Sequence, residues 1–286
     1  MDSVHRFLFE DLDIRGALVQ LGPSWAAMNS RRHYAPPVRD MLGQLAAITA
    51  LIGSNLKVPG RISFQLQGHG AVTLLVMDCD EQLHLRGMAK SALTADAETH
   101  ITSVGDLLGD GRLVLTLHSK TAQTPYQSVV PITGKTLADI FEHYLTQSEQ
   151  QPARMWLAAT ADTACGLFLQ KLPDADLRDA DGWNRIETLA ATVSPVELAL
   201  PPETVLSRLF GTETLRLFPP REATWHCPRD EEKVRNMLLS MGREEVEAIL
   251  ADAEMIAIED EICGHEYRFG PEIVDELFPP DGRLLH

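Results

Sequence analysis

The chain has few cysteines and no long apolar run. It holds four cysteines in 286 residues, too few for a fold built on disulfides. The longest membrane-like stretch, 45–52, is far shorter than the roughly 20 residues of a membrane-spanning helix. Asp2, His5, Arg6 and Glu10 interrupt any apolar signal segment near the start. We therefore expect a cytoplasmic protein with reduced thiols and no membrane contact.

Positive charge is also scarce. The chain carries 25 Lys and Arg against 41 Asp and Glu, a formal net charge of −16. Binding to nucleic-acid phosphates needs clustered Lys and Arg, so nucleic acid is not an expected partner. Residues 223–286 alone hold sixteen acidic against six basic side chains. We interpret this region as a solvated acidic surface.

Catalytic signatures are missing from the sequence. Neither G-x-S-x-G nor H-E-x-x-H occurs. The pairs Gly68-His69-Gly70 and Gly109-Asp110-Gly111 are not followed by the Lys-Ser/Thr of a phosphate loop, and both are read as hairpin turns. Cys79, in a predicted turn, and Cys165, at a strand start, have no convincing partner in sequence. No enzyme is therefore expected, although an enzyme on the α+β core stays as an alternative.

Residues 1–173 combine strand and helix patterns. Apolar positions at helical spacing follow Pro36-Pro37, where proline suits a helix start. A capping box predicts another helix start at Thr136-Leu137-Ala138-Asp139. The strands are expected at 7–9, 14–21, 61–67, 72–77, 83–88, 113–118, 127–132, 155–159 and 166–171. This region is predicted to be a β-sheet-rich α+β core domain.

The pattern becomes helical at about residue 174. Residues 174–222 are predicted to be a helical linker. A third, small domain is expected over 223–286, with a hairpin at its centre. The apolar positions of the linker are Trp183, Ile186, Leu189, Leu206, Leu209 and Phe210.

Two cysteine-containing segments carry the most specific signal. They read Trp225-His226-Cys227-Pro228-Arg229 and Asp260-Glu261-Ile262-Cys263-Gly264-His265. With the segments His5–Glu10, Phe64–Gly68 and Tyr126–Val130, in this order, they resemble the heat shock protein 33 family of redox-regulated chaperones. That family carries C-x-C followed by C-x-x-C, four thiolates around one zinc. The resemblance extends over essentially the whole chain.

The resemblance implies a function. It implies an ATP-independent holdase, which binds unfolding client proteins on apolar surface and prevents their aggregation. The linker residues Trp183, Ile186, Leu189, Leu206, Leu209 and Phe210 would then cover the client surface until they detach, or else simply pack a permanent core. The family also implies a zinc-ribbon-like C-terminal domain, and it leaves open a homodimer in the active form.

This sequence departs from the family pattern at two of the four ligand positions. Arg229 and Asp260 stand where the family has cysteines, and we expect an ion pair between them in place of the metal. His226 or His265 could add a nitrogen ligand, but a closed site needs more ligands, so no zinc is expected. Cys227 and Cys263 would be neighbours, as two reduced thiols or as a disulfide.

Three readings of the regulation and function stay open. The first is activation by heat or general unfolding without zinc release, or activity that is partly constitutive. The second keeps redox control through Cys227 and Cys263 alone, under heat or oxidative stress. The third is a metal-dependent interaction module without holdase activity.

Overall fold

The computed structural model describes residues 2–30, 32–56, 59–95, 103–122 and 124–279. Contacts divide the chain into two compact units, residues 1–226 and 227–286. We call them the N-terminal unit and the C-terminal unit and describe each by itself. By this criterion the segment expected to be a linker lies inside the N-terminal unit, and the boundary follows His226.

The first sheet of the N-terminal unit is antiparallel. Its strand order is β10-β1-β2-β9-β8, and β11 also pairs with β1. The strands are β1 (Ser3–Phe9), β2 (Ile14–Leu21), β8 (Ala153–Ala159), β9 (Ala164–Lys171), β10 (Leu215–Leu217) and β11 (Arg221–Glu222). Strand β9 is buried at all positions except its last residue. Because successive side chains point to opposite faces, both faces of this sheet are covered.

The second sheet has the order β12-β5-β4-β3-β6-β7. Its strands are β3 (Gly60–Gly68), β4 (Val72–Asp80), β5 (His84–Ser91), β6 (Gly111–Ser119), β7 (Tyr126–Pro131) and β12 (Thr224–Trp225). Only β12 is parallel to its neighbour, β5. The backbone N–H of His226 donates to the carbonyl of Leu85 at 3.0 Å. The end of the N-terminal unit is thus bonded to an edge strand.

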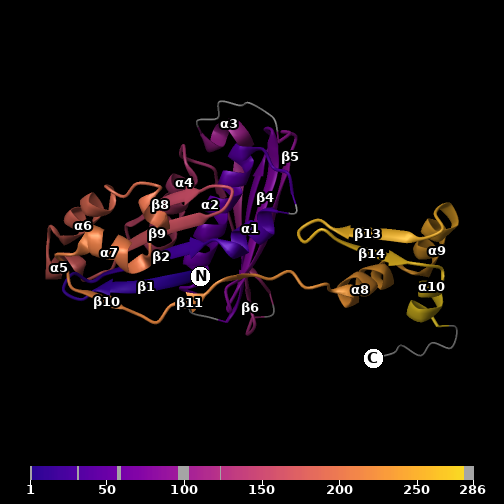
Figure 1. Ribbon diagram of the computed structural model, residues 1–286. Helices are drawn as coiled ribbons and strands as arrows, with labels where there is room; N and C mark the ends of the chain where they lie inside the picture. The colour runs from indigo at the N-terminus through magenta and orange to yellow at the C-terminus, as the bar shows by residue number, and fades with distance from the viewer. Residues whose placement is uncertain (1, 31, 57–58, 96–102, 123, 280–286) are drawn as a thin grey trace. The chain divides into compact units, whose positions relative to one another are not determined.

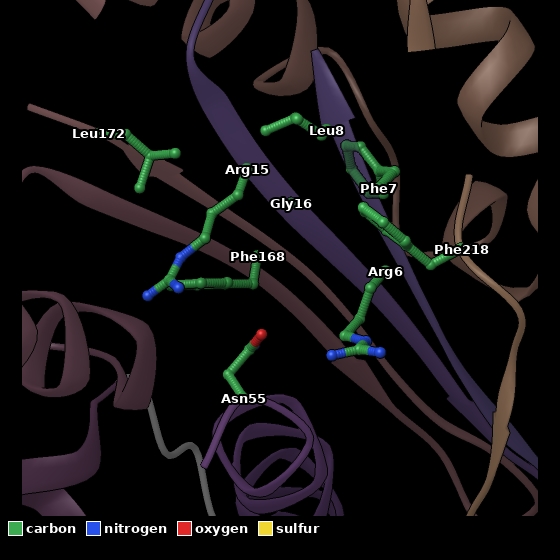
Figure 2. Close-up of a pocket in the computed structure, with 9 residues that line it drawn as sticks. All are labelled: Arg6, Phe7, Leu8, Arg15, Gly16, Asn55, Phe168, Leu172 and Phe218. Atoms are coloured by element: carbon green, nitrogen blue, oxygen red, sulfur yellow. The ribbon is translucent and has the colours of Figure 1, made fainter. Parts of the chain in front are cut away.

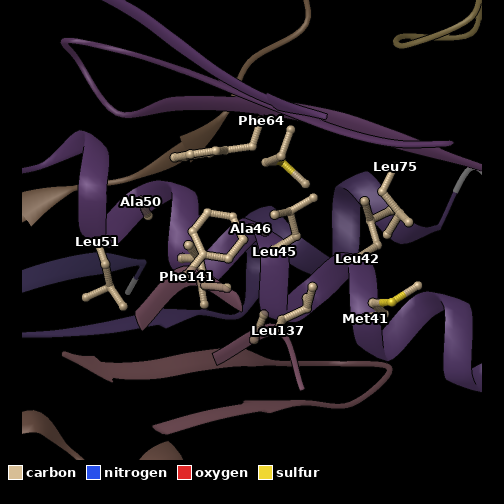
Figure 3. Packing of buried hydrophobic residues seen from close by; sticks show 14 of the residues in the cluster. Met41, Leu42, Leu45, Ala46, Ala50, Leu51, Phe64, Leu75, Leu137 and Phe141 are labelled. Atoms are coloured by element: carbon tan, nitrogen blue, oxygen red, sulfur yellow. The ribbon is translucent and has the colours of Figure 1, made fainter. Parts of the chain in front are cut away.

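Helix α2 (Pro36–Gly53) lies between the two sheets (Figure 1) and begins at the predicted Pro36-Pro37. It packs against β2, β8 and β9 on one side and β3, β4 and β5 on the other. A helix that is apolar around most of its circumference must be buried. We call the cluster around it the main core (Figure 3), which includes Met41, Leu42, Leu45, Ala46, Leu51, Phe64, Leu75, Leu137 and Phe141.

Capping boxes start two of the other helices. At α4 (Leu137–Glu149), Asp139 N donates to Thr136 Oγ1 at 3.1 Å and Thr136 N donates to Asp139 Oδ2 at 2.9 Å, which confirms the predicted start. Ser103 and Asp106 form the same arrangement at α3, where none was predicted. The remaining helices of the unit are α1 (Pro23–Asn29), α3 (Val104–Leu108), α4 (Leu137–Glu149), α5 (Ala175–Arg178), α6 (Gly182–Ala190), η1 (Glu197–Ala199) and α7 (Pro202–Phe210).

Helix α3 explains one wrong turn prediction. Gly68-His69-Gly70 joins β3 to β4 as predicted. Gly109, however, ends α3 with a φ of 62°, a conformation that favours glycine, and it is not part of a hairpin. The prediction that Cys79 lies in a turn was also wrong, because β4 continues to Asp80 and contains Cys79. The turn begins only after that residue.

The segment 174–222 is helical only in its first part. After α7 the chain adds β10, of 3 residues, and β11, of 2 residues, along β1. Strands this short give no measurable alternation in the sequence. Their pairing is set by the neighbouring strand, which the sequence pattern does not reveal.

The C-terminal unit is a hairpin packed with short helices. Its elements are α8 (Glu231–Met241), α9 (Arg243–Asp252), β13 (Ile256–Asp260), β14 (His265–Phe269) and α10 (Glu272–Leu277). The antiparallel pairing of β13 with β14 confirms the expected hairpin around Cys263 and Gly264. Its small core consists of Leu238, Val246, Ile256, Tyr267, Phe269, Ile273 and Val274.

Candidate functional site

A second apolar cluster lies on the face of the first sheet that is turned away from α2. Along β2, Ala17 and Val19 belong to the main core, while Ile14 and Leu18 belong to this second cluster. Alternating side chains of one strand reach opposite faces of a sheet, so the two clusters are separated by the sheet itself. We call the second one the linker cluster; on the sheet side it contains Phe7, Phe9, Ile14, Leu18, Cys165, Leu167 and Leu169.

The predicted cover residues all lie in the linker cluster. Helix α6 presents its apolar positions at intervals of three, and α7 begins with Pro202 at its first turn. Ile186, Leu206 and Phe210 are buried, with exposures of 0%, 3% and 1%. Trp183, Leu189 and Leu209 are partly buried and pack against the same cluster. The segment therefore covers the outer face of β1, β2 and β9.

Phe210 is the central contact between α7 and the sheet. Its ring lies 5.0 Å from that of Phe9, with the ring planes at 80°, and 6.2 Å from that of Phe7. Edge-to-face pairs of this kind are favoured by the charge distribution of the rings. Phe7 in turn lies over Gly16, its partner on β2, where a Cβ atom would collide with the ring. The glycine is required for this approach.

Polar contacts also join the linker segment to the first sheet, and no sequence motif marks them. Arg154 on β8 bonds Glu187 on α6 at 2.6 Å and lies 3.5 Å from Glu142 on α4. Burial raises the pKa of Glu142 to about 7, although a hydrogen bond from the N–H of Met155 and the charge of Arg154 oppose the shift. Gln20 donates to the carbonyl of Leu198 at 2.7 Å. These isolated polar residues have no motif around them.

In the C-terminal unit Cys227 and Cys263 are joined by a disulfide. Their Cα atoms are 5.8 Å apart, inside the range that a disulfide spans, at a sequence separation of 36. Cys263 is buried. His265 Nε2 lies 2.7 Å from the carbonyl oxygen of Cys227, so the two segments are bonded at a second point. The structure brings the two predicted cysteines together.

Among the residues that the structure describes, no ion pair joins Arg229 to Asp260, so this prediction was wrong. The guanidinium of Arg229 donates to the carbonyl of Glu266 and lies 5.1 Å from the centre of the Tyr267 ring. Asp260 Oδ1 instead accepts from the N–H groups of Ile262 and Cys263 at 2.9 and 3.2 Å. A carboxylate at a hairpin turn bonds its own backbone, which competes with a distant cation.

These residues do not fit the four-thiolate zinc site that the resemblance implied. The two sulfur atoms are bonded to each other, and a thiol must be deprotonated and free to hold Zn²⁺. A guanidinium stands at one family ligand position, and the carboxylate at the other is committed to the turn. Within the described parts of the chain, no three His, Cys, Asp or Glu side chains gather in a way that could hold a metal ion.

The other two cysteines are buried thiols of the N-terminal unit. Burial raises the pKa of Cys79 to about 12 and that of Cys165 to about 11. The thiolate is the reactive form, so both are poor nucleophiles at neutral pH. They pack as small apolar side chains.

Comparison with known proteins agrees with this architecture. A model of the Hsp33 protein family matches residues 2–270, which include most of both units. The chain belongs to the Hsp33 family. It is 38% identical over 280 residues to a 33 kDa chaperonin of Methylobacillus flagellatus, covering 97% of this chain and 94% of the relative. A 33 kDa chaperonin of Vibrio cholerae is 36% identical over 295 residues and is covered to 99%.

A solved structure of the same family has the same fold. The crystal structure of the 33 kDa chaperonin, or Hsp33 homolog, of Thermotoga maritima matches with a TM-score of 0.79 over 96% of this chain and 97% of that one. The identity in this match is 20%. This confirms the α+β fold of an Hsp33 protein. Whether the C-terminal unit is a zinc ribbon does not follow from it.

Proposed function

We propose that this Hsp33-family chaperone is an ATP-independent holdase. It binds unfolding proteins on the outer face of β1, β2 and β9, which α6 and α7 cover in the resting form. The supporting observation is the separation of the linker cluster from the main core by a sheet. Detaching the cover would expose Phe7, Phe9 and Leu167 without opening the main core. Such local opening costs less free energy than global unfolding.

In this proposal, activation follows heat or partial unfolding and requires no release of zinc. The disulfide closes a loop of the C-terminal unit and restricts its unfolded chain. Oxidation therefore stabilises this unit, where a zinc-released switch would loosen it.

The proposed clients are partly unfolded proteins in the cytoplasm. The net charge of −16 disfavours nucleic acid as a partner and helps to keep client complexes soluble. None of the helices in the described residues is long and apolar enough to cross a membrane. The relatives are named chaperonins, and we propose no enzymatic activity.

Light scattering of a heat-unfolded model client tests the holdase activity. Purified protein should suppress scattering without peroxide, and increasingly so as the temperature rises. Zinc content and free thiols are measured on the same sample, purified without chelator. Activity that stays negligible until peroxide is added would refute the proposed trigger and favour redox control through Cys227 and Cys263. The Cys227→Ser, Cys263→Ser double variant should then lose that response.

The position of the client surface is tested by loosening the cover. Phe210→Ala should lower the temperature at which suppression begins, because Phe210 is buried against Phe9 and Phe7. Leu177→Ala is the control, since Leu177 lies in the same segment with 85% of its surface exposed. Equal onset temperatures for both variants and the unaltered protein would place the client surface elsewhere.

A further inference from the structure

A small cavity lies on the inner side of the first sheet and shares one lining residue, Phe7, with the linker cluster. It has a volume of about 260 Å³ and opens beside β1 and the segment after β10 (Figure 2). This is just below the roughly 300–1,000 Å³ of sites for drug-sized ligands, which favours a ligand the size of a chain end. Its lining includes Arg6, Arg15, Asn55, Phe168 and Phe218.

Arg6 is the unusual member of this lining. Its Nε is buried and has no hydrogen-bond partner. The guanidinium lies 5.8 Å from the centre of the Phe218 ring and takes part in none of the ion pairs found in the described part of the chain. An unsatisfied buried donor on a charged group costs free energy that an anionic acceptor would recover. Figure 2 shows this guanidinium directed into the space between β1 and Asn55.

The charges around Arg6 limit the kind of anion. Arg15 is the second cation of the lining, but it already bonds Gln170 at 2.8 Å and Glu149 at 3.3 Å. Glu149 lines an adjoining cavity that shares Arg15, and its carboxylate would repel a second negative charge. A monoanionic carboxylate therefore fits better than a doubly charged phosphate.

Asn55 supplies a hydrogen-bond acceptor, whereas Arg6 supplies donors. Its Nδ2 donates to the carbonyl of Leu51 at 3.0 Å, which fixes the orientation of the amide. The oxygen is left as an acceptor, and Figure 2 shows it pointing toward the cavity. Phe168 and Phe218 provide apolar walls. The cavity thus combines a cationic donor, a neutral acceptor for an N–H group, and aromatic surface.

We propose that this cavity binds the carboxyl-terminal end of a polypeptide with an apolar last residue. The terminal carboxylate would bond Arg6, the last amide N–H would donate to Asn55, and the apolar side chain would lie against Phe168 and Phe218. Charge-assisted bonds from arginine to carboxylate are among the strongest in proteins. Recognition of chain ends in this way is an established mode of peptide binding.

Calorimetric titration of the full chain tests the proposal, with N-acetylphenylalanine as the probe and N-acetylphenylalanine amide as its neutral match. The acid should bind and the amide should bind at least about tenfold more weakly, as expected for the loss of one charge-assisted bond. Equal binding of acid and amide, or no binding of the acid, overturns the proposal. Acetate that binds as tightly as the probe would also overturn it, because it shows an anion site without recognition of a chain end.

Two arginine variants test whether the acid binds at Arg6. Arg6→Met should weaken binding of the acid by about tenfold or more. Arg61→Met is the matched control, since Arg61 also has a buried Nε without a partner but does not line the cavity. Loss of affinity in both variants, or in neither, contradicts the assignment. If Arg6→Met fails to fold, the comparison of acid and amide still decides. Binding is measured without any client, so its outcome is separate from that of the holdase assays.

Discussion

The main core and the linker cluster contain the same local contact in different surroundings. In the main core, Phe64 and Phe141 meet with ring centres 4.9 Å apart and planes at 76°. In the linker cluster, Phe9 and Phe210 meet at 5.0 Å and 80°. Phe64 and Phe141 are 0% exposed, and Phe9 and Phe210 are each 1% exposed. The two pairs are close to interchangeable in geometry.

What differs is the covering of each pair. Phe141 is packed within a cluster that includes α2 and strands of both sheets. Phe210, the last residue of α7, packs against one sheet face together with the other short linker helices. The same segment also contains Leu177 and Val196, which are 85% and 79% exposed. In the proposed function, the same kind of ring contact therefore stabilises the whole unit in one place and a separable cover in the other. Stability need not be uniform across a structure.

Alanine variants of the two phenylalanines should separate these roles. Removing a buried Phe side chain costs about 3–5 kcal/mol. We expect Phe141→Ala to lower the free energy of unfolding of the entire N-terminal unit by this amount. Phe210→Ala should instead raise amide hydrogen exchange mainly in α6 and α7, with β3, β4 and α2 still protected. Hydrogen exchange read by mass spectrometry measures both.

Which elements exchange faster, more than how much faster they exchange, decides whether the linker cluster is separable from the main core. If Phe210→Ala raises exchange equally in the main core and in the cover, the linker cluster is a permanent part of one cooperative unit. The comparison between the two clusters would then fail, and the proposed client surface with it.

Much of this arrangement could be predicted where local chemistry decides the structure. Pro36-Pro37 and the Thr136–Asp139 capping box set helix starts by local sterics and hydrogen bonds. Glycine turns and alternation predicted β3 to within one residue at each end and the start of β4, whose end lies three residues beyond the predicted one. The apolar positions of α6 and α7 followed from helical spacing, although spacing did not reveal which face of which sheet they contact.

The interactions that depend on distant partners could not be predicted. Arg229 and Asp260 have opposite charges at positions that the resemblance assigned to a shared metal, yet each bonds a backbone group of the hairpin instead. Arg154 and Gln20 hold the cover through contacts over 33 and 178 positions of sequence separation. No local pattern marks such residues, because their neighbours in space are set by the fold.

Reduction of the disulfide tests whether the stability of the C-terminal unit depends on a covalent bond, unlike the stability of the two apolar clusters. Closing a loop of 36 positions is worth roughly 4 kcal/mol on the loop-entropy estimate. Reducing agent should therefore lower the melting temperature of the C-terminal unit, while exchange in the main core and the linker cluster stays unchanged. The Cys227→Ser, Cys263→Ser double variant should melt at the lower temperature and ignore the reductant. Reduced protein that melts at a higher temperature would show that the bond loosens the unit.

The smallest of the predicted effects on stability is expected at Arg154, which lies between α4 and α6. Glu142 on α4, whose apolar residues belong to the main core, and Glu187 on α6 both lie against Arg154. Burial raises the pKa of Glu142 from 4.5 to about 7, so the folded protein favours its protonated form. The stability that this provides is fully present below the unfolded pKa of 4.5 and is lost as the pH rises through about 7.

Glu142→Gln should remove this pH dependence. One proton gives a slope of at most about 1.4 kcal/mol per pH unit in the free energy of unfolding. Between pH 5 and 7, unfolding in urea should show a steeper decline for the unaltered protein than for Glu142→Gln. Glu187→Gln is the control, because Glu187 is the weakest of the influences on the pKa of Glu142, and it should keep most of the slope. Identical slopes in all three proteins would mean that the pKa of Glu142 is not raised in the folded state. Protonation of this half-buried carboxyl would then not be linked to the contact of Arg154 with Glu187 on α6.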